Sequence, residues 1–339
     1  MPDLTINAVA FTGRGKVELI SLAKPSCENG KVLVRVTRSA LCGSDMGPDQ
    51  QFFMAERSKP IIVGHESVGI VEDSGDNNFS VGQRVAILVI TGCMKCPACK
   101  RGRFSLCSKP GVVKNTNAEY VLVPACNLIP LPDDISYEMA LLGFGCGLGV
   151  ALGGVNRLSF SPGQYVAVVG IGPIGMCVIE TLKQRGAFPV AIDVNPNRLE
   201  TAVKLGAKHT FNPTKSGFDE IGKLQGINAI EHVIMCSANE RALITGLELL
   251  RKEGTMILLG APAMANINTF RHIVATDVTI RGSWHYGMEH VQEILALLRR
   301  MRNPELVLTH VFPVHKCQEA YNLFVSGNCG KVLLDWDGE

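Results

Sequence analysis

Two cysteines and a histidine in the first half of the chain have the chemistry of a catalytic zinc site. Cys42 lies in a Cys-Gly-Ser-Asp segment, His65 in a Val-Gly-His-Glu segment, and Cys146 in a Phe-Gly-Cys-Gly segment. Two thiolates and one imidazole hold zinc while leaving the fourth tetrahedral position open for water or a substrate. We therefore predict that Cys42, His65 and Cys146 bind a zinc ion that takes part in catalysis.

Four more cysteines are spaced Cys-x2-Cys-x2-Cys-x7-Cys between residues 93 and 107. Thiolates this close together repel one another unless a cation neutralises them, and four of them fill the tetrahedral shell of zinc. We predict that Cys93, Cys96, Cys99 and Cys107 hold a structural zinc ion that stiffens the loop. A redox disulfide pair and an iron–sulfur site are the alternatives.

The segment from Gly170 to Gly175 has the Gly-x-Gly-x-x-Gly spacing of a dinucleotide-binding loop. It follows the apolar run Tyr165–Val169 and precedes a predicted helix, and Asp193 ends the next apolar run. Glycines let the backbone approach a pyrophosphate, the helix N-terminus offers free N–H groups, and the acidic side chain accepts hydrogen bonds from ribose hydroxyls. Because a carboxylate there repels a 2′-phosphate, we predict NAD rather than NADP.

Arg198 follows Asp193 closely and would weaken the preference for NAD if it faced the ribose; the alternative is an ordinary exposed helix residue. We expect the cofactor to be contacted also by residues of the later predicted strands. The full predicted set is Gly170, Gly172, Pro173, Ile174, Gly175, Asp193, Arg198, Cys236, Gly260, Ala261 and Ser283.

The elements that must position these residues change in character near residue 164. Before it, short runs such as residues 31–38 and 67–72 alternate polar and apolar side chains between Gly-, Asn- and Asp-rich turns, a pattern typical of a Greek-key β-barrel. After it, apolar runs alternate with helical patterns, and six strands indicate a doubly wound parallel sheet. We also predict a helix from about residue 136, an amphipathic helix over residues 288–301, and final strands at 307–311 and 331–335.

Length and composition bound the class of protein. A chain of 339 residues is long enough for two domains. The net charge of +2, from 33 basic and 31 acidic residues, provides no field for nucleic acid. The N-terminus lacks a basic segment followed by an apolar stretch, and no run of 18 apolar residues occurs. We therefore predict a cytoplasmic protein that acts on a small molecule, without a nucleic-acid or membrane partner.

Together these motifs resemble those of the zinc-dependent medium-chain dehydrogenases, the alcohol and polyol dehydrogenase superfamily, over essentially the whole chain. The shared features are the Cys42 and His65 segments, the four-cysteine loop, Cys146 placed 24 residues before Gly170, and the glycine-rich loop itself. The resemblance implies an α/β protein with a GroES-like β-barrel domain at 1–150 plus 286–339, including a structural zinc lobe at about 91–108. A Rossmann NAD-binding domain, a doubly wound parallel sheet, would be inserted at 151–285.

The resemblance also implies roles for the neighbours of the three predicted ligands. Asp45 would hold the second ring nitrogen of His65, and Glu66 would lie behind the metal as an occasional ligand. Ser44 would take the proton from the alcohol. The family further implies two zinc ions per chain and a homo-oligomer, either a tetramer or a dimer.

Two departures from the family pattern bear on function. Many relatives have a histidine two positions after the aspartate of the first motif, whereas Met46 and Gly47 follow Asp45 here, so the proton must leave by water, ribose or another side chain. Only ten residues separate Cys107 from Ala118, so a loop that borders the substrate is expected to be trimmed.

The segment Gly282-Ser283-Trp284 is closer to sugar and polyol members, and 6% aromatic residues supply little material for a tight apolar pocket. We predict NAD-dependent oxidation of a secondary alcohol on a polyol, sugar or cyclitol. Trp284, His285 and Tyr286 either line the substrate pocket or pack between domains. The alternatives are a biosynthetic ketone or aldehyde reductase, a simple secondary alcohol dehydrogenase, and a non-enzymatic NAD-binding descendant.

Overall fold

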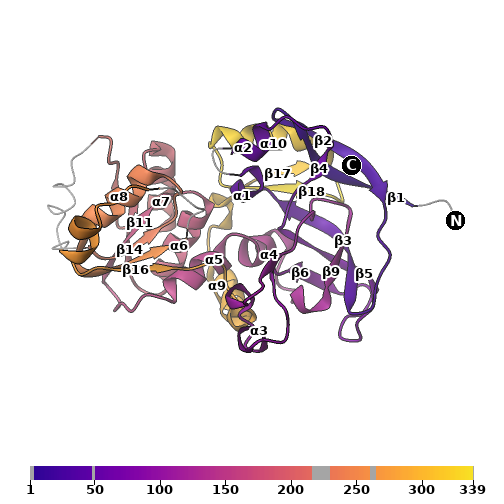
Figure 1. Cartoon of the computed structure of the whole chain (residues 1–339), viewed down its shortest axis with the longest axis horizontal. Helices are drawn as coiled ribbons and strands as arrows, with labels where there is room; N and C mark the ends of the chain where they lie inside the picture. Colours follow the sequence, from indigo (N-terminus) through magenta and orange to yellow (C-terminus); the bar gives the residue numbers. More distant parts are fainter. Residues whose placement is uncertain (1–3, 48–49, 216–229, 260–264, 339) are drawn as a thin grey trace. The chain divides into compact units, whose positions relative to one another are not determined.

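The chain folds into two compact units (Figure 1). A computed structural model describes residues 4–47, 50–215, 230–259 and 265–338. The first unit comprises Met1–Cys146, Gly287–Arg299 and Leu308–Glu339, and the second comprises Gly147–Tyr286 and Arg300–Val307. The division lies slightly before residue 150, because helix α5 (Leu148–Val155) packs against helix α6 (Pro173–Gln184) of the second unit.

The first unit is built on antiparallel strands. They are β1 (Thr5–Gly13), β2 (Lys16–Ala23), β3 (Lys31–Ala40), β4 (Ile61–Ile62), β5 (Ser67–Ser74), β6 (Arg84–Ile87), β7 (Ile90–Thr91), β8 (Gly111–Val112), β9 (Tyr120–Pro124), β10 (Leu128–Pro130), β17 (Leu308–Pro313) and β18 (Lys331–Asp335). The main sheet has the order β10-β6-β5-β3-β18-β17, with β9 also paired to β3, and a smaller sheet has the order β2-β1-β4. Apolar residues of β3, β5, β6 and β9 form a common core, which agrees with the predicted β-rich domain.

Both ends of the chain contribute to this unit. Strand β18 pairs antiparallel with β3 and parallel with β17, so Leu333 lies opposite Ala40. Its helices are α1 (Gly43–Met46), α2 (Gln51–Met54), α3 (Pro97–Lys100), α4 (Tyr137–Phe144), α9 (Val291–Arg300, whose last residue groups with the second unit) and α10 (Cys317–Ser326). The hydroxyl of Ser136 accepts a hydrogen bond from the Met139 N–H at 3.2 Å, so α4 begins where the sequence predicts.

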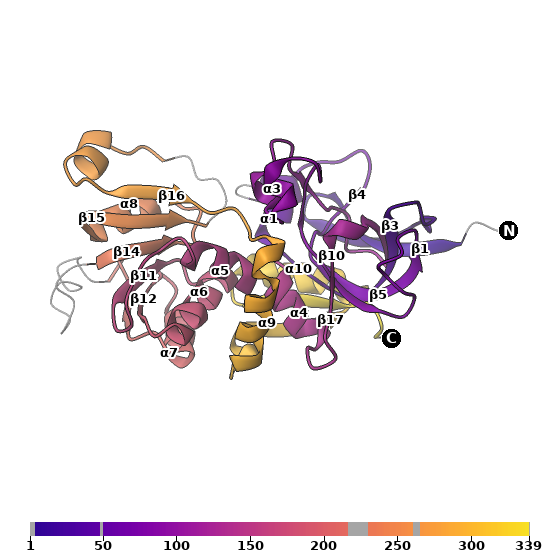
Figure 2. The ribbon, with the colours of Figure 1, turned by 90° about the horizontal axis from the view of Figure 1, so that it is seen from below.

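The second unit is a parallel sheet covered by helices (Figure 2). Its remaining elements are β11 (Tyr165–Val169), β12 (Phe188–Ile192), α7 (Pro196–Leu205), β13 (His209–Phe211), β14 (Ile230–Met235), α8 (Glu240–Leu249), β15 (Leu250–Leu258), a π-helix (Phe270–Val274) and β16 (Thr279–Gly282). The strand order β13-β12-β11-β14-β15-β16 reverses direction at β11 and β14. Since crossovers between parallel strands are right-handed, helices α6 and α7 cover one face and α8 the other. This is the predicted doubly wound Rossmann sheet, and ligands bind such sheets at the point of reversal.

The three glycines at the turn from β11 into α6 differ in how strictly the tight turn requires them. Gly170 has φ of +91°, in the region that favours glycine. A side chain on Gly175 would place its Cβ 2.0 Å from the carbonyl oxygen of Gly170. A Cβ on Gly172, in contrast, would meet no atom within 4 Å. The first and third glycines are therefore required by the protein's own packing, whereas Gly172 borders open space.

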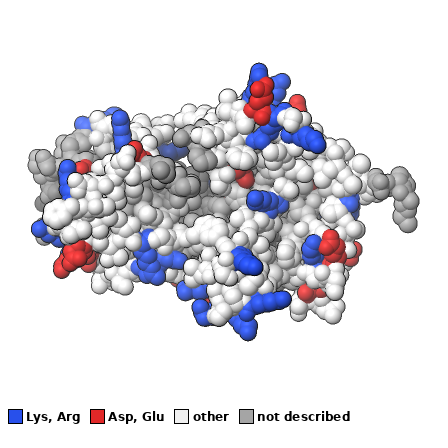
Figure 3. Space-filling model, viewed as in Figure 1, with Lys and Arg blue, Asp and Glu red and all other residues white. Residues whose placement is uncertain are grey.

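Charged side chains and apolar helical segments can be located on the described part of the chain. Basic and acidic side chains are interspersed with large uncharged areas on the face shown in Figure 3. Within the described ranges, one helical stretch, Tyr137–Val155, is long and apolar enough to cross a bilayer, but 89% of it is buried inside the protein. A core helix passes the same test, so this stretch is weak evidence for a membrane segment. Cytoplasmic localisation stays a prediction.

Replacing Gly175 with Ala is expected to lower the free energy of unfolding by about 3 kcal/mol, because the added methyl group overpacks the turn. The matched control is Gly172→Ala, which meets no neighbour and should leave the stability nearly unchanged. Denaturation by urea measures both. Equal stability of the two variants would show that the turn tolerates a side chain at either position.

Candidate functional site

Four potential ligands meet in the first unit: Cys42, His65, Glu66 and Cys146 have donor atoms within 4.8 Å of one another. The sheet explains how segments far apart in sequence converge. Strand β3 ends just before Cys42 and β5 begins just after Glu66, and the two strands pair antiparallel at these ends. The Ala40 N–H donates to the Glu66 carbonyl oxygen at 3.0 Å, which locks the two segments together.

Cys146 reaches the cluster from the end of α4. Its backbone N–H donates to the Glu66 carboxylate Oε2 at 2.9 Å. The preceding residue must be glycine, because a Cβ on Gly145 would lie 2.1 Å from that same oxygen. Gly64, before His65, has φ of +94°, and its Cβ would clash with Asn117. The glycines that flank the predicted ligands therefore permit their close approach.

Asp45 orients the imidazole of His65. The ring Nδ1 donates to Asp45 Oδ1 at 2.8 Å, which leaves Nε2 to act as the ligand atom. Nε2 lies 3.3 Å from the Cys146 sulfur, 3.8 Å from Glu66 Oε1 and 3.4 Å from the hydroxyl of Ser44. Ser44 is exposed, and its hydroxyl donates to the Cys42 sulfur at 3.3 Å.

The donor set fits a zinc ion. With Zn–S near 2.3 Å and Zn–N near 2.0 Å, ligand atoms of a tetrahedral site are about 3.5 to 3.8 Å apart. The spacings around His65 Nε2 fall close to this range. The donors are two soft thiols, an imidazole and a carboxylate, the combination that zinc accepts.

The cluster's own electrostatics prepare it for a cation. A hydrogen bond from Cys146, together with the nearby His65, holds the pKa of Cys42 well below its usual value despite burial. The same contact with Cys42, and burial, raise the pKa of Cys146. Burial alone would lower the pKa of His65, but Cys42 and Asp45 raise it well above its usual value. A divalent cation would displace these retained protons as it binds.

Lys331 completes the cluster, and our sequence reasoning missed it. This lysine, the first residue of β18, is 2% exposed, and its Nζ lies 2.7 and 2.6 Å from the two carboxylate oxygens of Glu66. Burial would lower the pKa of Lys331, but Glu66 and the two cysteines raise it, so the ammonium stays charged. Burial raises the pKa of Glu66, and Lys331 opposes that shift. The available signal was a lysine followed directly by three apolar residues of the same strand, since a buried lysine needs a partner.

The four-cysteine group forms a second potential metal site, between β7 and β8. Its four sulfur atoms lie within 4.8 Å of one another, and the sulfurs of Cys96 and Cys99 are 3.5 Å apart. Backbone N–H groups of Lys95 and Cys96 lower the pKa of Cys93 to about 6, while burial raises that of Cys99 to about 12. A Cβ on Gly92 would lie 2.4 Å from the sulfur of Cys99, so the loop closes around this group only with glycine there.

In the second unit, a cavity of about 640 Å³ lies at the carboxyl ends of β11 to β14. Asp193 Oδ2 accepts the Ile171 N–H at 2.7 Å and Oδ1 accepts the Asn195 N–H at 2.8 Å, which fixes the carboxylate at the mouth of the glycine turn. Arg198 Nη1 lies 3.8 Å from Asp193 Oδ2. Arg198 therefore faces the cavity and is not an ordinary exposed helix residue.

The predicted cofactor residues divide by location. Gly170, Gly172, Asp193, Arg198 and Cys236 line the cavity. Pro173, Ile174 and Gly175 form the first turn of α6 beside it. Ser283 is buried just after β16 and is not among the lining residues, whereas Gly260 and Ala261 lie outside the described residues.

The sequence reasoning missed several lining residues: Thr214, Ser237, Asn239, Arg241 and Thr245. The first three lie just beyond the carboxyl ends of β13 and β14. Polar residues that follow predicted strands could therefore have been identified from the sequence as cavity residues. The other two lie on α8. Of the substrate-side candidates, Trp284 is 48% exposed and Tyr286 is 2% exposed, and His285 has φ of +56°.

Comparison with known proteins places both units in one family. Residues 28–133 match the alcohol dehydrogenase GroES-like domain, and residues 173–300 match the zinc-binding dehydrogenase domain. An L-threonine 3-dehydrogenase from Marinomonas sp. is 31% identical, over 92% of this chain and 94% of that protein. The chain therefore belongs to the zinc-binding alcohol dehydrogenase family of medium-chain oxidoreductases.

Solved structures show the same architecture. An alcohol dehydrogenase from Thermus sp. is 28% identical, with a TM-score of 0.86 over 97% of this chain and 99% of that one. An L-idonate 5-dehydrogenase from Escherichia coli, 23% identical, shares the fold, with a TM-score of 0.85 over 98% and 99% of the two chains. The predicted fold class is confirmed.

Replacing Lys331 with Met should lower the free energy of unfolding by about 3 to 5 kcal/mol, because the Glu66 carboxylate is then buried without its cation. The double variant Glu66→Gln/Lys331→Met removes both charges and should recover most of that loss. Chemical denaturation of the metal-free proteins measures the difference. A single variant as stable as the double variant would contradict the pairing.

Proposed function

We propose that this protein transfers a hydride between NAD(H) and a secondary alcohol or its ketone, in a zinc-dependent reaction, with a polyol, sugar or cyclitol as the substrate class. The observation that carries the proposal is the convergence of Cys42, His65, Glu66 and Cys146 in the first unit. Family membership supports the oxidoreductase class.

Cys42, His65 and Cys146 would hold a catalytic zinc ion, with Glu66 as an occasional further ligand. When bound there, zinc lowers the pKa of an alcohol substrate and polarises a ketone. Asp45 keeps the His65 ring in the tautomer whose Nε2 can bind metal. Lys331 holds Glu66 through both oxygens, so a metal would compete with Lys331 for the electron density of this carboxylate.

Ser44 is the proposed first acceptor of the substrate proton. Its hydroxyl lies next to Cys42 and His65, and the residue is exposed. A proton taken up by this hydroxyl can pass directly to solvent, so the chain does not need the histidine that many relatives have after the aspartate. The one active site serves both directions of the reaction, so a physiological reductase uses the same residues.

The four-cysteine group would hold the second zinc ion, with a structural role. Four thiolates complete a tetrahedral shell and leave no position for substrate. The N–H groups around Cys93 favour a thiolate, which is the form that binds metal.

The cavity at the carboxyl ends of β11 to β14 would bind NAD, with Asp193 facing the adenosine ribose and Gly172 leaving room for the pyrophosphate. Arg198 lies close enough to Asp193 to neutralise part of its charge, so we expect preference for NAD over NADP rather than exclusion of NADP.

The substrate proposal has a second candidate. Relatives named as L-threonine 3-dehydrogenases match nearly the whole chain at about a third identity, and L-threonine carries a secondary hydroxyl next to polar groups. A panel of polyols, aminocyclitols, L-threonine and simple secondary alcohols, followed at the NADH absorption band, tests both. The proposal predicts the highest kcat/KM for a polyhydroxylated compound, and preference for a simple apolar alcohol would refute it.

Replacing Cys42 with Ser should abolish turnover but leave the unfolding midpoint close to that of the wild type. Replacing Cys99 with Ser should mainly lower the stability, because it opens a structural site. Metal analysis should find two zinc ions per chain in the wild type and fewer in each variant. Equal loss of stability in both variants would contradict this division of roles.

Replacing Asp193 with Ala should shift the ratio of kcat/KM for NAD to that for NADP by at least about tenfold towards NADP, the equivalent of one charge-assisted hydrogen bond. The two cofactors are compared on the same protein, so a general loss of stability cancels from the ratio. An unchanged ratio would defeat the assignment of Asp193.

The predicted homo-oligomer also stays a proposal. Among the described strands, β16 pairs only with β15, and three of its four residues are exposed. Phe270 and Trp284, nearby in sequence, are exposed apolar residues. A second copy pairing along this edge would cover the unpaired backbone groups of β16, and sedimentation velocity that finds only monomer would rule this pairing out.

A further inference from the structure

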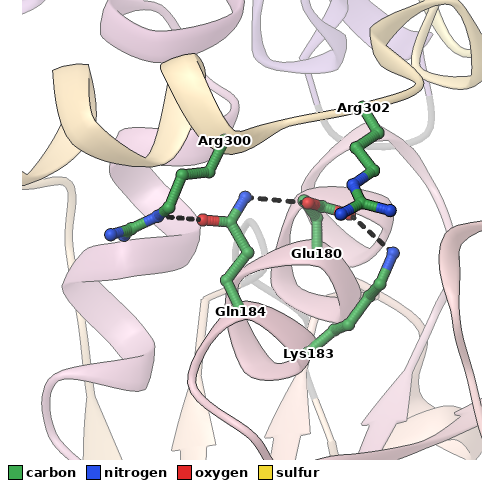
Figure 4. Close-up of a pocket in the computed structure, with 5 residues that line it drawn as sticks. All are labelled: Glu180, Lys183, Gln184, Arg300 and Arg302. Atoms are coloured by element: carbon green, nitrogen blue, oxygen red, sulfur yellow. Dashed lines mark hydrogen bonds and ion pairs between the residues drawn. The ribbon is translucent and has the colours of Figure 1, made fainter.

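Figure 4 shows a second cavity of the second unit. Its residues Glu180, Lys183 and Gln184 belong to the C-terminal part of α6, away from the glycine turn. The cavity has a volume of about 420 Å³. All the residues that line it are polar or charged: Glu180, Lys183, Gln184, Arg300 and Arg302. Glu180 is eight residues beyond Gly172, which corresponds to about 12 Å along a helix, so this cavity is separate from the one assigned to NAD.

The floor of the cavity is fixed by hydrogen bonds. The Glu180 side chain is 6% exposed, and its Oε1 accepts a hydrogen bond from Gln184 Nε2 at 2.8 Å. The other end of the Gln184 amide accepts from Arg300 Nε at 3.0 Å. Gln184 therefore connects the buried Glu180 carboxylate to the exposed Arg300 guanidinium, and these bonds hold the Arg300 side chain in place.

Two cations around this floor retain unused hydrogen-bond donors. Lys183 Nζ lies 3.8 Å from Glu180 Oε2, an ion-pair distance that is too long for a hydrogen bond, and its side chain is 44% exposed. Arg302 is exposed and makes no hydrogen bond or ion pair with another residue of the described ranges. In Figure 4 its guanidinium lies on the same side of Glu180 as the Lys183 ammonium.

The charges of the cavity do not balance. Lys183, Arg300 and Arg302 carry three positive charges against the single negative charge of Glu180, so the lining has a net charge of +2. A carboxylate buried at the base of a pocket needs one cation to neutralise it, and the other two remain available to a ligand.

We propose that this cavity binds the phosphoryl group of a small dianion, either inorganic phosphate or a phosphomonoester. A guanidinium offers parallel N–H donors that match two phosphate oxygens, and an ammonium adds a point charge. Arg302 and Lys183 supply these two groups. At about 30 Å³ for each water-sized group, the cavity has room for roughly a dozen such groups, more than phosphate alone requires.

Isothermal titration calorimetry on the zinc-loaded protein saturated with NADH tests the proposal, because NADH fills the other site that accepts phosphate groups. The probes are inorganic phosphate and glycerol 3-phosphate, with glycerol and sodium chloride at matched ionic strength as controls. We expect saturable binding of one phosphate compound per chain and none of either control. Tighter binding of the ester would identify a phosphorylated metabolite as the ligand, whereas equal binding would indicate free phosphate.

Variants locate the site. Arg302→Gln and Lys183→Gln should each weaken phosphate binding at least about tenfold, since each removes a charge-assisted hydrogen bond. Lys204→Gln, an exposed lysine of α7 outside the cavity, should leave binding unchanged. Both cavity residues are exposed, so the unfolding midpoints without phosphate should match the wild type. Absence of saturable binding, or binding that neither cavity variant weakens, would overturn the proposal. The test does not depend on turnover, so it stands apart from the proposed dehydrogenase activity.

Discussion

The first unit depends on neutralising the charge of a buried carboxylate, Glu66, that lies close to cysteine thiols. Glu66 is fully buried, next to two cysteines, and Lys331 contacts both of its carboxylate oxygens. The backbone N–H of Cys146 donates to the same carboxylate. One side chain therefore joins the segment before β5, the end of α4 and the start of β18. A cation held by Cys42, His65 and Cys146 would add a second centre of positive charge beside the same carboxylate.

The second unit relies on a steric constraint instead. Gly175 lets α6 approach the carbonyl of Gly170 more closely than any side chain would allow, which sets the first turn of the helix against the strand. Asp193 then accepts the N–H of Ile171, so the acidic residue and the glycine turn form one rigid structure. If this cavity binds the proposed dinucleotide, the preference between NAD and NADP would depend on Asp193 and on Arg198, whose Nη1 lies 3.8 Å from Asp193 Oδ2.

These two constraints bear on the proposed reaction and cofactor but not on the choice of substrate. If the cluster around His65 carries out the proposed reaction, it would do so for any alcohol whose hydroxyl reaches it. Similar proteins carry different names, among them an L-threonine 3-dehydrogenase and an alcohol dehydrogenase. Specificity depends on the residues that surround the reacting carbon. The cavity at the far end of α6 is lined only by polar and charged side chains, and the proposed phosphate site there would be separate from the glycine turn.

The sequence by itself determined the features that local segments encode. The cysteine spacing from Cys93 to Cys107, the glycine loop with Asp193, and the strand patterns all follow from residues close together in the chain. In the structure the four cysteine sulfurs meet, and the glycine loop and Asp193 border one cavity. Their roles in binding zinc and NAD stay predictions. Even Cys42, His65 and Cys146 were recognisable, because zinc ligands are chemically distinctive residue types. Tertiary structure alone decided that Lys331 lies against Glu66, 265 positions away, and that Arg241 rather than Ser283 lines the cavity. The physical reason is that a buried carboxylate needs a cation close to it in space, however far away that residue is in the sequence. The antiparallel pairing of β18 with β3 brings Lys331 to Glu66.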